Sequence, residues 1–201
     1  MTLSKSKLES EFSKVMDEND PNFVGWPSTI LAGINNFATA YENYAKDAVD
    51  YSEDALLTYN KAGFIGALTG LNINSTYVDA ATAMENAFNA FWKKATFAVL
   101  KLIPPPLPPP APPPECPNVG GLLLFSKEET SAIFATDVGN ILYTTLLPEL
   151  QKVEASDMIN KISRLADIWH TATTTTILCL ISGLDTTAPS PLPITNLCHI
   201  H

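Results

Sequence analysis

Histidine and cysteine, the side chains best suited to metal binding and nucleophilic catalysis, are rare in this chain of 201 residues, and its three histidines all lie near its end. Cys198, His199 and His201 form one short cluster. Side chains two residues apart share a face of an extended strand, so His199 and His201 could bind zinc or nickel together. No further ligand can be identified, and residues at a chain terminus are poorly preorganised. We therefore expect no metal and no cofactor, with chelation by the two histidines as the less favoured alternative.

His170 is the remaining histidine, and a nucleophilic site would have to be built around it. A Ser–His–acid triad also needs backbone amides that bind an oxyanion, and the sequence offers no loop for them. It likewise contains neither a glycine-rich phosphate loop nor the HExxH motif of zinc proteases. Ser4 and Lys7 match the SxxK spacing, but they lie in a charged segment without the companion motifs. We expect the protein not to be an enzyme.

The charge of the chain disfavours two classes of ligand. The net charge is −9 and Arg164 is the single arginine, whereas a phosphate backbone is bound by clustered Lys and Arg. We therefore expect no direct contact with nucleic acid, and the acidity also disfavours docking on an anionic membrane. No uncharged apolar run approaches the ~20 residues of a membrane span, so we expect a soluble protein made in the cytoplasm.

The exterior must be only weakly charged. Charged residues are 16% of the chain, below the ~25% usual for soluble domains, while hydrophobic residues at 46% are enough to build a core. This profile fits a protein whose surface is partly covered by partners. We therefore expect a protein that is packed against neighbouring subunits.

Residues 1–103 are expected to form an N-terminal helical region. Apolar side chains recur there at helical spacing, and Thr76 and Asp79 have the form of a capping box. The first two predicted helices cover about residues 3–18 and 27–48, with Leu8 and Phe12 on the apolar face of the first and Ile30 and Ile34 on that of the second. A third begins at Ser52 and carries Leu56, Tyr59 and Ala62, and the longest covers residues 76–103.

The proline-rich segment is the clearest feature of the sequence. Residues 104–114 read PPPLPPPAPPP, which can form neither a helix nor a central strand and must adopt polyproline II. We assign residues 104–117 as a stiff spacer that spans roughly 34 Å over its eleven-residue core. The alternative is a ligand for an aromatic-lined groove, in which Leu107 and Ala111 would be the contact residues.

Residues 118–182 are expected to form a C-terminal helical region. Ser126 and Glu129 match a capping box, which predicts a helix that ends at Pro148. A last helix begins at Ser156 or nearby and runs through Trp169. The threonines at 171–176 are β-prone, and residues 177–181 could form either a strand or a buried helix end.

Residues 183–201 are expected to form an extended tail. Pro189, Pro191 and Pro193 alternate, which keeps the chain extended, and Asp185 is its single charged residue. We interpret the tail as a partner-binding arm, with folding back onto the chain's own helices as the alternative. Its proposed partner-binding residues are Leu184, Leu192, Ile194 and Leu197. The predicted fold class is thus mainly α, with helical bundles interrupted by a polyproline II spacer, a short β-prone segment and an extended C-terminal tail.

Two stretches carry a resemblance to a known group of proteins. The opening LSKSKLE at residues 3–9 and the late pattern IWHTATT at 168–174, followed by GLDTT at 183–187 and PLP at 191–193, resemble small virion proteins of large tailed bacteriophages with contractile tails. The resemblance implies a helical body that ends in a threonine-rich strand and a proline-containing tail. It also implies a structural role in the tail or baseplate, or next in the neck or capsid-associated parts.

Two functional hypotheses follow. The first is a non-enzymatic structural subunit of a phage particle, made in the host cytoplasm and located in the virion. Its partners would be other virion structural proteins and copies of itself. The alternative is a cytosolic adaptor whose proline-rich segment recruits a groove-bearing domain.

Overall fold

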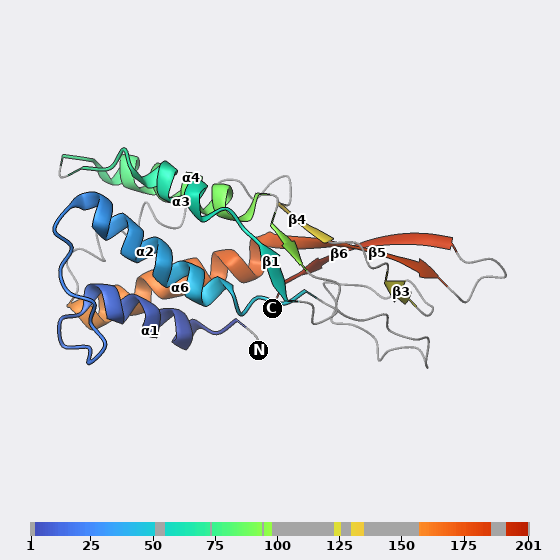
Figure 1. Ribbon diagram of the computed structural model, residues 1–201, viewed down its shortest axis with the longest axis horizontal. Coiled ribbons are helices and arrows are strands. Elements are labelled where there is room, and N and C mark those ends of the chain that lie inside the picture. The colour runs from blue at the N-terminus through green and yellow to red at the C-terminus, as the bar shows by residue number, and fades with distance from the viewer. Residues whose placement is uncertain are drawn as a thin grey trace.

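The chain is mainly helical, as a computed structural model shows, with the helices at one end and a β-sheet at the other (Figure 1). The described residues are 3–50, 55–72, 74–93, 95–97, 123–125, 130–134, 157–185 and 192–200. The predicted spacer, with Leu107 and Ala111, lies outside them. Among them, no helix combines the length and apolarity needed to cross a lipid bilayer.

The first two predicted helices are confirmed. Helix α1 (Lys5–Met16) begins after Ser4, whose side chain accepts a hydrogen bond from the Lys7 amide, and α2 (Ile30–Ala45) begins after Thr29, which caps it in the same way. Leu8 and Phe12 of the predicted apolar face of α1 are fully buried. On α2, Ile30 is an exception to the predicted face, since it is half exposed.

The predicted third helix is wrong at its start. Residues Leu56–Thr58 form strand β1, and helix α3 (Lys61–Leu68) begins only after Asn60. The Asn60 side chain accepts a hydrogen bond from the Gly63 amide at 2.8 Å. A Cβ atom on Gly63 would lie 2.4 Å from the Asn60 amide nitrogen, so glycine at this position makes room for the cap. The cap therefore sets the start of the helix.

Helix α4 (Tyr77–Trp92) begins at the predicted capping box but ends well before residue 103. Lys93 is extended, and Thr96–Phe97 form strand β2, which pairs antiparallel with β1. A threonine next to an aromatic residue suits a strand, and the pairing satisfies backbone groups that a longer helix would have satisfied internally. Tertiary pairing here outweighs the helical propensity of the alanine-rich sequence.

Helix α6 (Met158–Thr176) includes the threonines that we expected to be β-prone. The hydroxyl groups of Thr173, Thr174 and Thr175 donate to backbone carbonyls four residues earlier, at 2.7, 3.0 and 2.7 Å. These bonds satisfy the hydroxyl groups within the helix. Strand β5 (Ile177–Asp185) begins at the next residue, so residues 177–181 adopt the strand alternative.

Strand β5 organises the sheet. Strand β6 (Leu192–His199) pairs antiparallel with it, from the Leu178–His199 pair to the Asp185–Leu192 pair. Strands β4 (Thr130–Phe134) and β3 (Leu123–Phe125) also pair with β5, one at each end of it. Strand β4 pairs in addition with β2, which joins six strands into one sheet.

The helix predicted from the Ser126 capping box is therefore wrong at residues 130–134. These residues read TSAIF and pair with β2 and β5. A segment that pairs with two strands satisfies its backbone groups without helix formation. The chain remains mainly helical, but its β structure extends beyond the single short segment that we expected.

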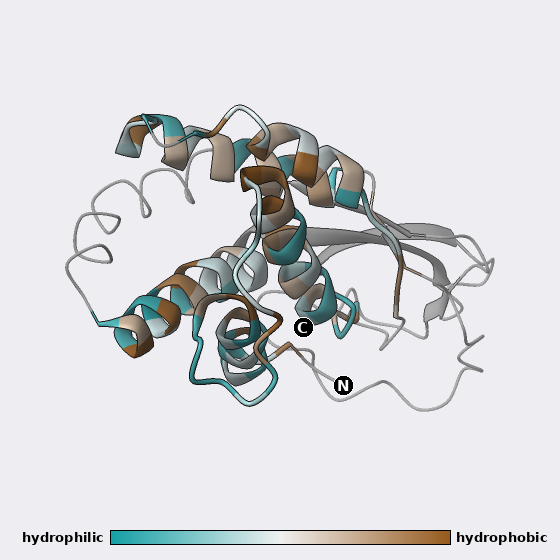
Figure 2. Cartoon of the chain, turned by 60° about the vertical axis from the view of Figure 1, so that its left-hand side comes forward, coloured by the Kyte–Doolittle hydropathy of each residue, from teal (hydrophilic) through white to brown (hydrophobic). Residues whose placement is uncertain are grey.

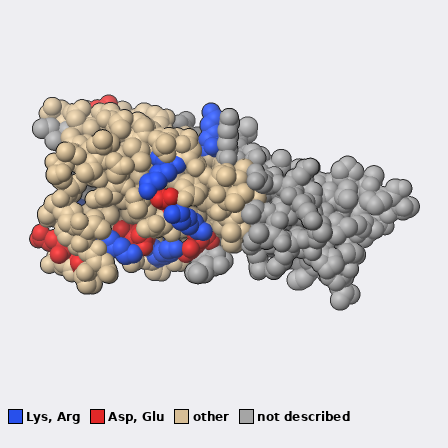
Figure 3. Space-filling view, viewed as in Figure 1, with Lys and Arg blue, Asp and Glu red and all other residues tan. Residues whose placement is uncertain are grey.

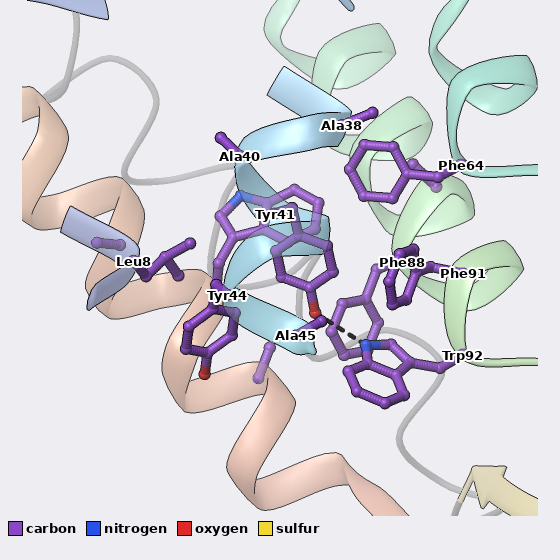
Figure 4. Close-up of a cluster of buried hydrophobic side chains, with 14 of the residues drawn as sticks. Leu8, Ala38, Ala40, Tyr41, Tyr44, Ala45, Phe64, Phe88, Phe91 and Trp92 are labelled. Carbon is purple, nitrogen blue, oxygen red and sulfur yellow. Dashed lines mark hydrogen bonds between the residues drawn. The ribbon is translucent and has the colours of Figure 1, made fainter. Parts of the chain in front are cut away.

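Tyr41 of α2 lies at the centre of the helical core (Figure 4). Its ring packs against rings from three other helices, with centroid distances of 5.5 Å to Phe64, 5.1 Å to Phe91 and 4.9 Å to Trp169. Figure 2 shows the corresponding pattern, with brown apolar segments on helices that also carry teal polar segments. The core thus joins α2, α3, α4 and α6.

A directed chain of hydrogen bonds crosses this core. Trp92 Nε1 donates to the Tyr41 hydroxyl at 2.8 Å, and the Thr173 hydroxyl donates to the Trp169 carbonyl at 2.7 Å. Because the Thr173 proton is used in that bond, the 2.8 Å contact between Tyr41 and Thr173 places Tyr41 as the donor. Burial is the main influence on the pKa of Tyr41 and raises it well above its usual range, so this hydroxyl stays protonated.

We predict that Tyr41→Phe destabilises the protein by about 1–3 kcal/mol, because the buried Trp92 N–H loses its acceptor while the packing area stays nearly unchanged. Urea denaturation followed by circular dichroism measures the loss. Tyr59→Phe is the matched comparison, since the Tyr59 hydroxyl is only partly buried, and removing its bond to Glu42 should destabilise the protein less. Equal stability of the Tyr41→Phe variant and the wild type would contradict the prediction.

Candidate interaction surface

The described partner-binding residues of the predicted tail lie in the β5–β6 hairpin. Leu184 is in β5, opposite Pro193, while Leu192, Ile194 and Leu197 are in β6, opposite Asp185, Gly183 and Leu180. The tail segment 192–199 is therefore extended, as expected, and its backbone pairs with a strand of its own chain. Contact of these residues with a partner stays a prediction.

Exposed apolar side chains gather at the other end of the molecule, which sequence reasoning missed. Val24, Trp26, Ile30 and Leu31, which we call the tip surface, are 59, 61, 50 and 52% exposed. They belong to the loop between α1 and α2 and to the first turn of α2, at the end of the helices that lies away from the sheet (Figure 1). Single exposed apolar residues are ordinary, but four within eight positions mark a contact surface.

The loop that carries the tip surface is held by its own hydrogen bonds. The Phe23 amide donates to the Asp20 carbonyl and the Val24 amide to the Lys14 carbonyl, both at 2.9 Å. Gly25 has a φ of 89°, which favours glycine and turns the chain between Val24 and Trp26. The loop is thus ordered without any partner, which lowers the entropy that binding would cost.

Trp26 is placed as an anchor on this surface. Its ring stands edge-on to Phe23, with centroids 5.1 Å apart, and its Nε1 donates to Glu18 Oε2 at 3.3 Å. These contacts orient the ring while most of it stays exposed. Tryptophan is enriched among the residues that dominate binding energy at protein interfaces. The sequence signal that could have revealed this surface is the tryptophan itself. The apolar residues at helical spacing on either side of the loop point instead to a buried face.

Three carboxylates border the tip surface. Asp17, Glu18 and Asp20 lie on the same loop, and among the described residues none of them forms a salt bridge with Lys or Arg. On the face drawn in Figure 3, red and blue mix in a band across its lower and central part, and red without adjacent blue appears at the left-hand end and at the upper edge. The tip surface is therefore apolar at its centre and acidic at its border.

His170, the candidate for nucleophilic chemistry, has a structural partner. Its Nδ1 lies 2.6 Å from the Tyr44 hydroxyl, so the bond ties α6 to α2. Burial lowers the pKa of His170 and outweighs the opposing effect of Asp167, which favours the neutral ring. Within the described part of the chain, no three His, Cys, Asp or Glu side chains come together as metal ligands.

A groove of about 520 Å³ lies beside the connection between α3 and α4. Its lining mixes polar and apolar side chains, and the one carboxylate in it is that of Asp79. That group already accepts hydrogen bonds from the amide and hydroxyl of Thr76, which lower its pKa. The groove therefore offers no free catalytic group.

No family model, curated protein or solved structure matches this chain.

A charged cluster around Glu42 holds α2 against the segment that leads into α3. Tyr59 and Lys61 donate to the Glu42 carboxylate at 2.6 and 2.7 Å, and Lys46 lies 3.2 Å away. Partial burial opposes ionisation of Glu42, but hydrogen bonds from Lys61, Tyr59 and Lys46 prevail and lower its pKa to about 2.

We predict that Glu42→Gln reduces the acid sensitivity of folding. A lowered carboxyl pKa contributes stability that is present above the unfolded-state pKa of 4.5 and is lost as the pH falls towards 2. The variant should lose stability at pH 7, by about 1 kcal/mol or less because solvent screens the cluster, and should lose little more by pH 3. Urea denaturation at both pH values measures the difference.

The control is Glu18→Gln, which changes an exposed carboxylate outside the cluster and should keep the pH dependence of the wild type. If Glu42→Gln and the wild type lose equal stability between pH 7 and pH 3, the cluster does not have the assigned role.

Proposed function

We propose that the protein is a non-enzymatic structural subunit of a bacteriophage particle, in the tail or baseplate, or next in the neck or capsid-associated parts. The observation that carries the proposal is the tip surface, which exposes an oriented tryptophan and three aliphatic side chains on an ordered loop. Such a surface is suited to a protein neighbour. The partners are other virion structural proteins and copies of the chain itself, and the protein is made in the host cytoplasm and located in the virion.

Helix α1, which carries most of the opening stretch, contacts α6 just before the late pattern begins, and this supports treating the two helices as one unit. Lys5 Nζ lies 3.1 Å from Asp167 Oδ1. Ser163 also donates to Glu9 at 2.8 Å. These contacts join residues more than 150 positions apart in the sequence.

The sparse charge of the chain also supports a subunit role. Charged residues are 16% of the sequence, and much of the face in Figure 3 is uncharged. A particle subunit meets neighbours over much of its surface, so it needs fewer solvating charges than a free protein.

We predict that mass spectrometry of purified phage particles finds this chain at a fixed ratio to the other structural proteins. Trp26→Ser should lower its incorporation about 30-fold, because an anchor residue contributes about 2 kcal/mol or more to an interface. The melting temperature of the isolated variant should stay within about 2 °C of the wild type, since the side chain is mostly exposed.

Leu57→Thr is the matched control, because Leu57 is 48% exposed on β1, away from the tip surface, and should be incorporated normally. Absence of the chain from purified particles would contradict the proposed function. Normal incorporation of Trp26→Ser would contradict only the assignment of the tip surface.

A further inference from the structure

The border of the tip surface is negatively charged, and this restricts the kind of partner that the surface can bind. Its border carries Asp17, Glu18 and Asp20, and one oxygen of each side chain is used within the loop. Asp17 accepts from the Asn19 amide at 3.0 Å, Asp20 from the Asn22 amide at 2.7 Å, and Glu18 from Trp26. The three carboxylates are therefore held in place on the loop, and Glu18 is held against Trp26.

Several acidic groups elsewhere in the helical region pair with lysine, while Asp79 and Asp157 are used in helix caps. Salt bridges join Lys7 to Asp47 and Lys14 to Glu11, and Lys46 and Lys61 both reach Glu42. The three carboxylates at the tip have no such cation among the described residues. Their charge is thus left for an external partner to balance.

Two kinds of partner fit this surface poorly. A second copy that used the same surface in a symmetric contact would place two acidic borders opposite each other, which like-charge repulsion disfavours. A nucleic acid or an anionic membrane would bring further negative charge to the border. Positive charge beside an apolar contact is what complements the tip surface.

We propose that the tip surface binds a basic protein segment, in which lysine or arginine side chains flank an apolar side chain that packs on Trp26 and Leu31. The segment belongs to a neighbouring virion protein if the proposed function holds, and only this location of the partner rests on that function. The cations pair with Asp17, Glu18 and Asp20 and can also approach the face of the Trp26 ring.

A titration with two synthetic peptides tests the proposal on the purified full chain. One is an amphipathic helix of leucine and lysine of about 18 residues, or five turns, and the other has glutamate in place of each lysine. Trp26 is the reporter, because it is 61% exposed whereas Trp92 and Trp169 are fully buried, so a blue shift of the fluorescence follows its burial. The leucine–lysine peptide should bind and the leucine–glutamate peptide should not.

The combined variant Asp17→Asn, Glu18→Gln, Asp20→Asn removes the charges but keeps the acceptor oxygens that hold the loop. It should weaken binding about tenfold, as three ion pairs at the border of an interface would. Asp167→Asn removes one exposed carboxylate from α6 and should leave binding unchanged. Leu31→Ser should weaken binding while Leu57→Thr does not.

Three results would overturn the proposal: equal binding of both peptides, no binding of the lysine peptide, or equal weakening by Asp167→Asn and Glu18→Gln. Self-association in analytical ultracentrifugation that Leu31→Ser abolishes would also overturn it, in favour of a second copy as the partner. The proposed function fails separately, by absence of the chain from purified particles, and that result leaves the peptide measurements intact.

Discussion

The buried hydroxyl of Tyr41 accepts a hydrogen bond from Trp92 and donates one to Thr173, and through these two bonds it fixes α4 and α6 relative to α2. An interior of stacked aromatic rings can slide at little cost, because dispersion attraction has weak directional preference. A hydrogen bond in the same interior restricts distance and angle, and leaving it unmade costs more than in water. The aromatic core thus has one preferred arrangement, and the positions of α1 and the α1–α2 loop depend on it.

The sequence predicts helices better than it predicts where they end. Local signals were sufficient for the Thr76 cap and located the start of α6 to within a residue or two, because a cap is a contact between neighbours in the chain. The strands at 56–58, 96–97 and 130–134 depend on partners distant in sequence, and no local pattern specifies those partners. The threonines of α6 show the converse case, since β-branched residues stay helical where their hydroxyl groups reach the preceding turn.

The candidate surface was hidden from sequence reasoning for a related reason. Ile30 and Ile34 have the same residue type and helical spacing, which predicts one buried face, yet Ile34 is buried and Ile30 is exposed. Ile30 is the first residue of α2, next to the α1–α2 loop, whereas Ile34 lies one turn further along the helix and belongs to the buried core cluster. Trp26 and its acidic neighbours are likewise an ordinary polar loop in the sequence, and only the fold shows that the ring remains uncovered.

The direct passage from α6 into β5 gives the molecule mechanical continuity. Thr176 ends the helix and Ile177 begins the strand, so no flexible residue separates the aromatic core from the β5–β6 hairpin. The Leu178–His199 pair lies at the helix end of the hairpin, so a force that separates the end of β6 from the start of β5 opens the ladder one pair at a time from that end. Any load on β5 enters the helical region directly at Ile177, through the backbone of α6.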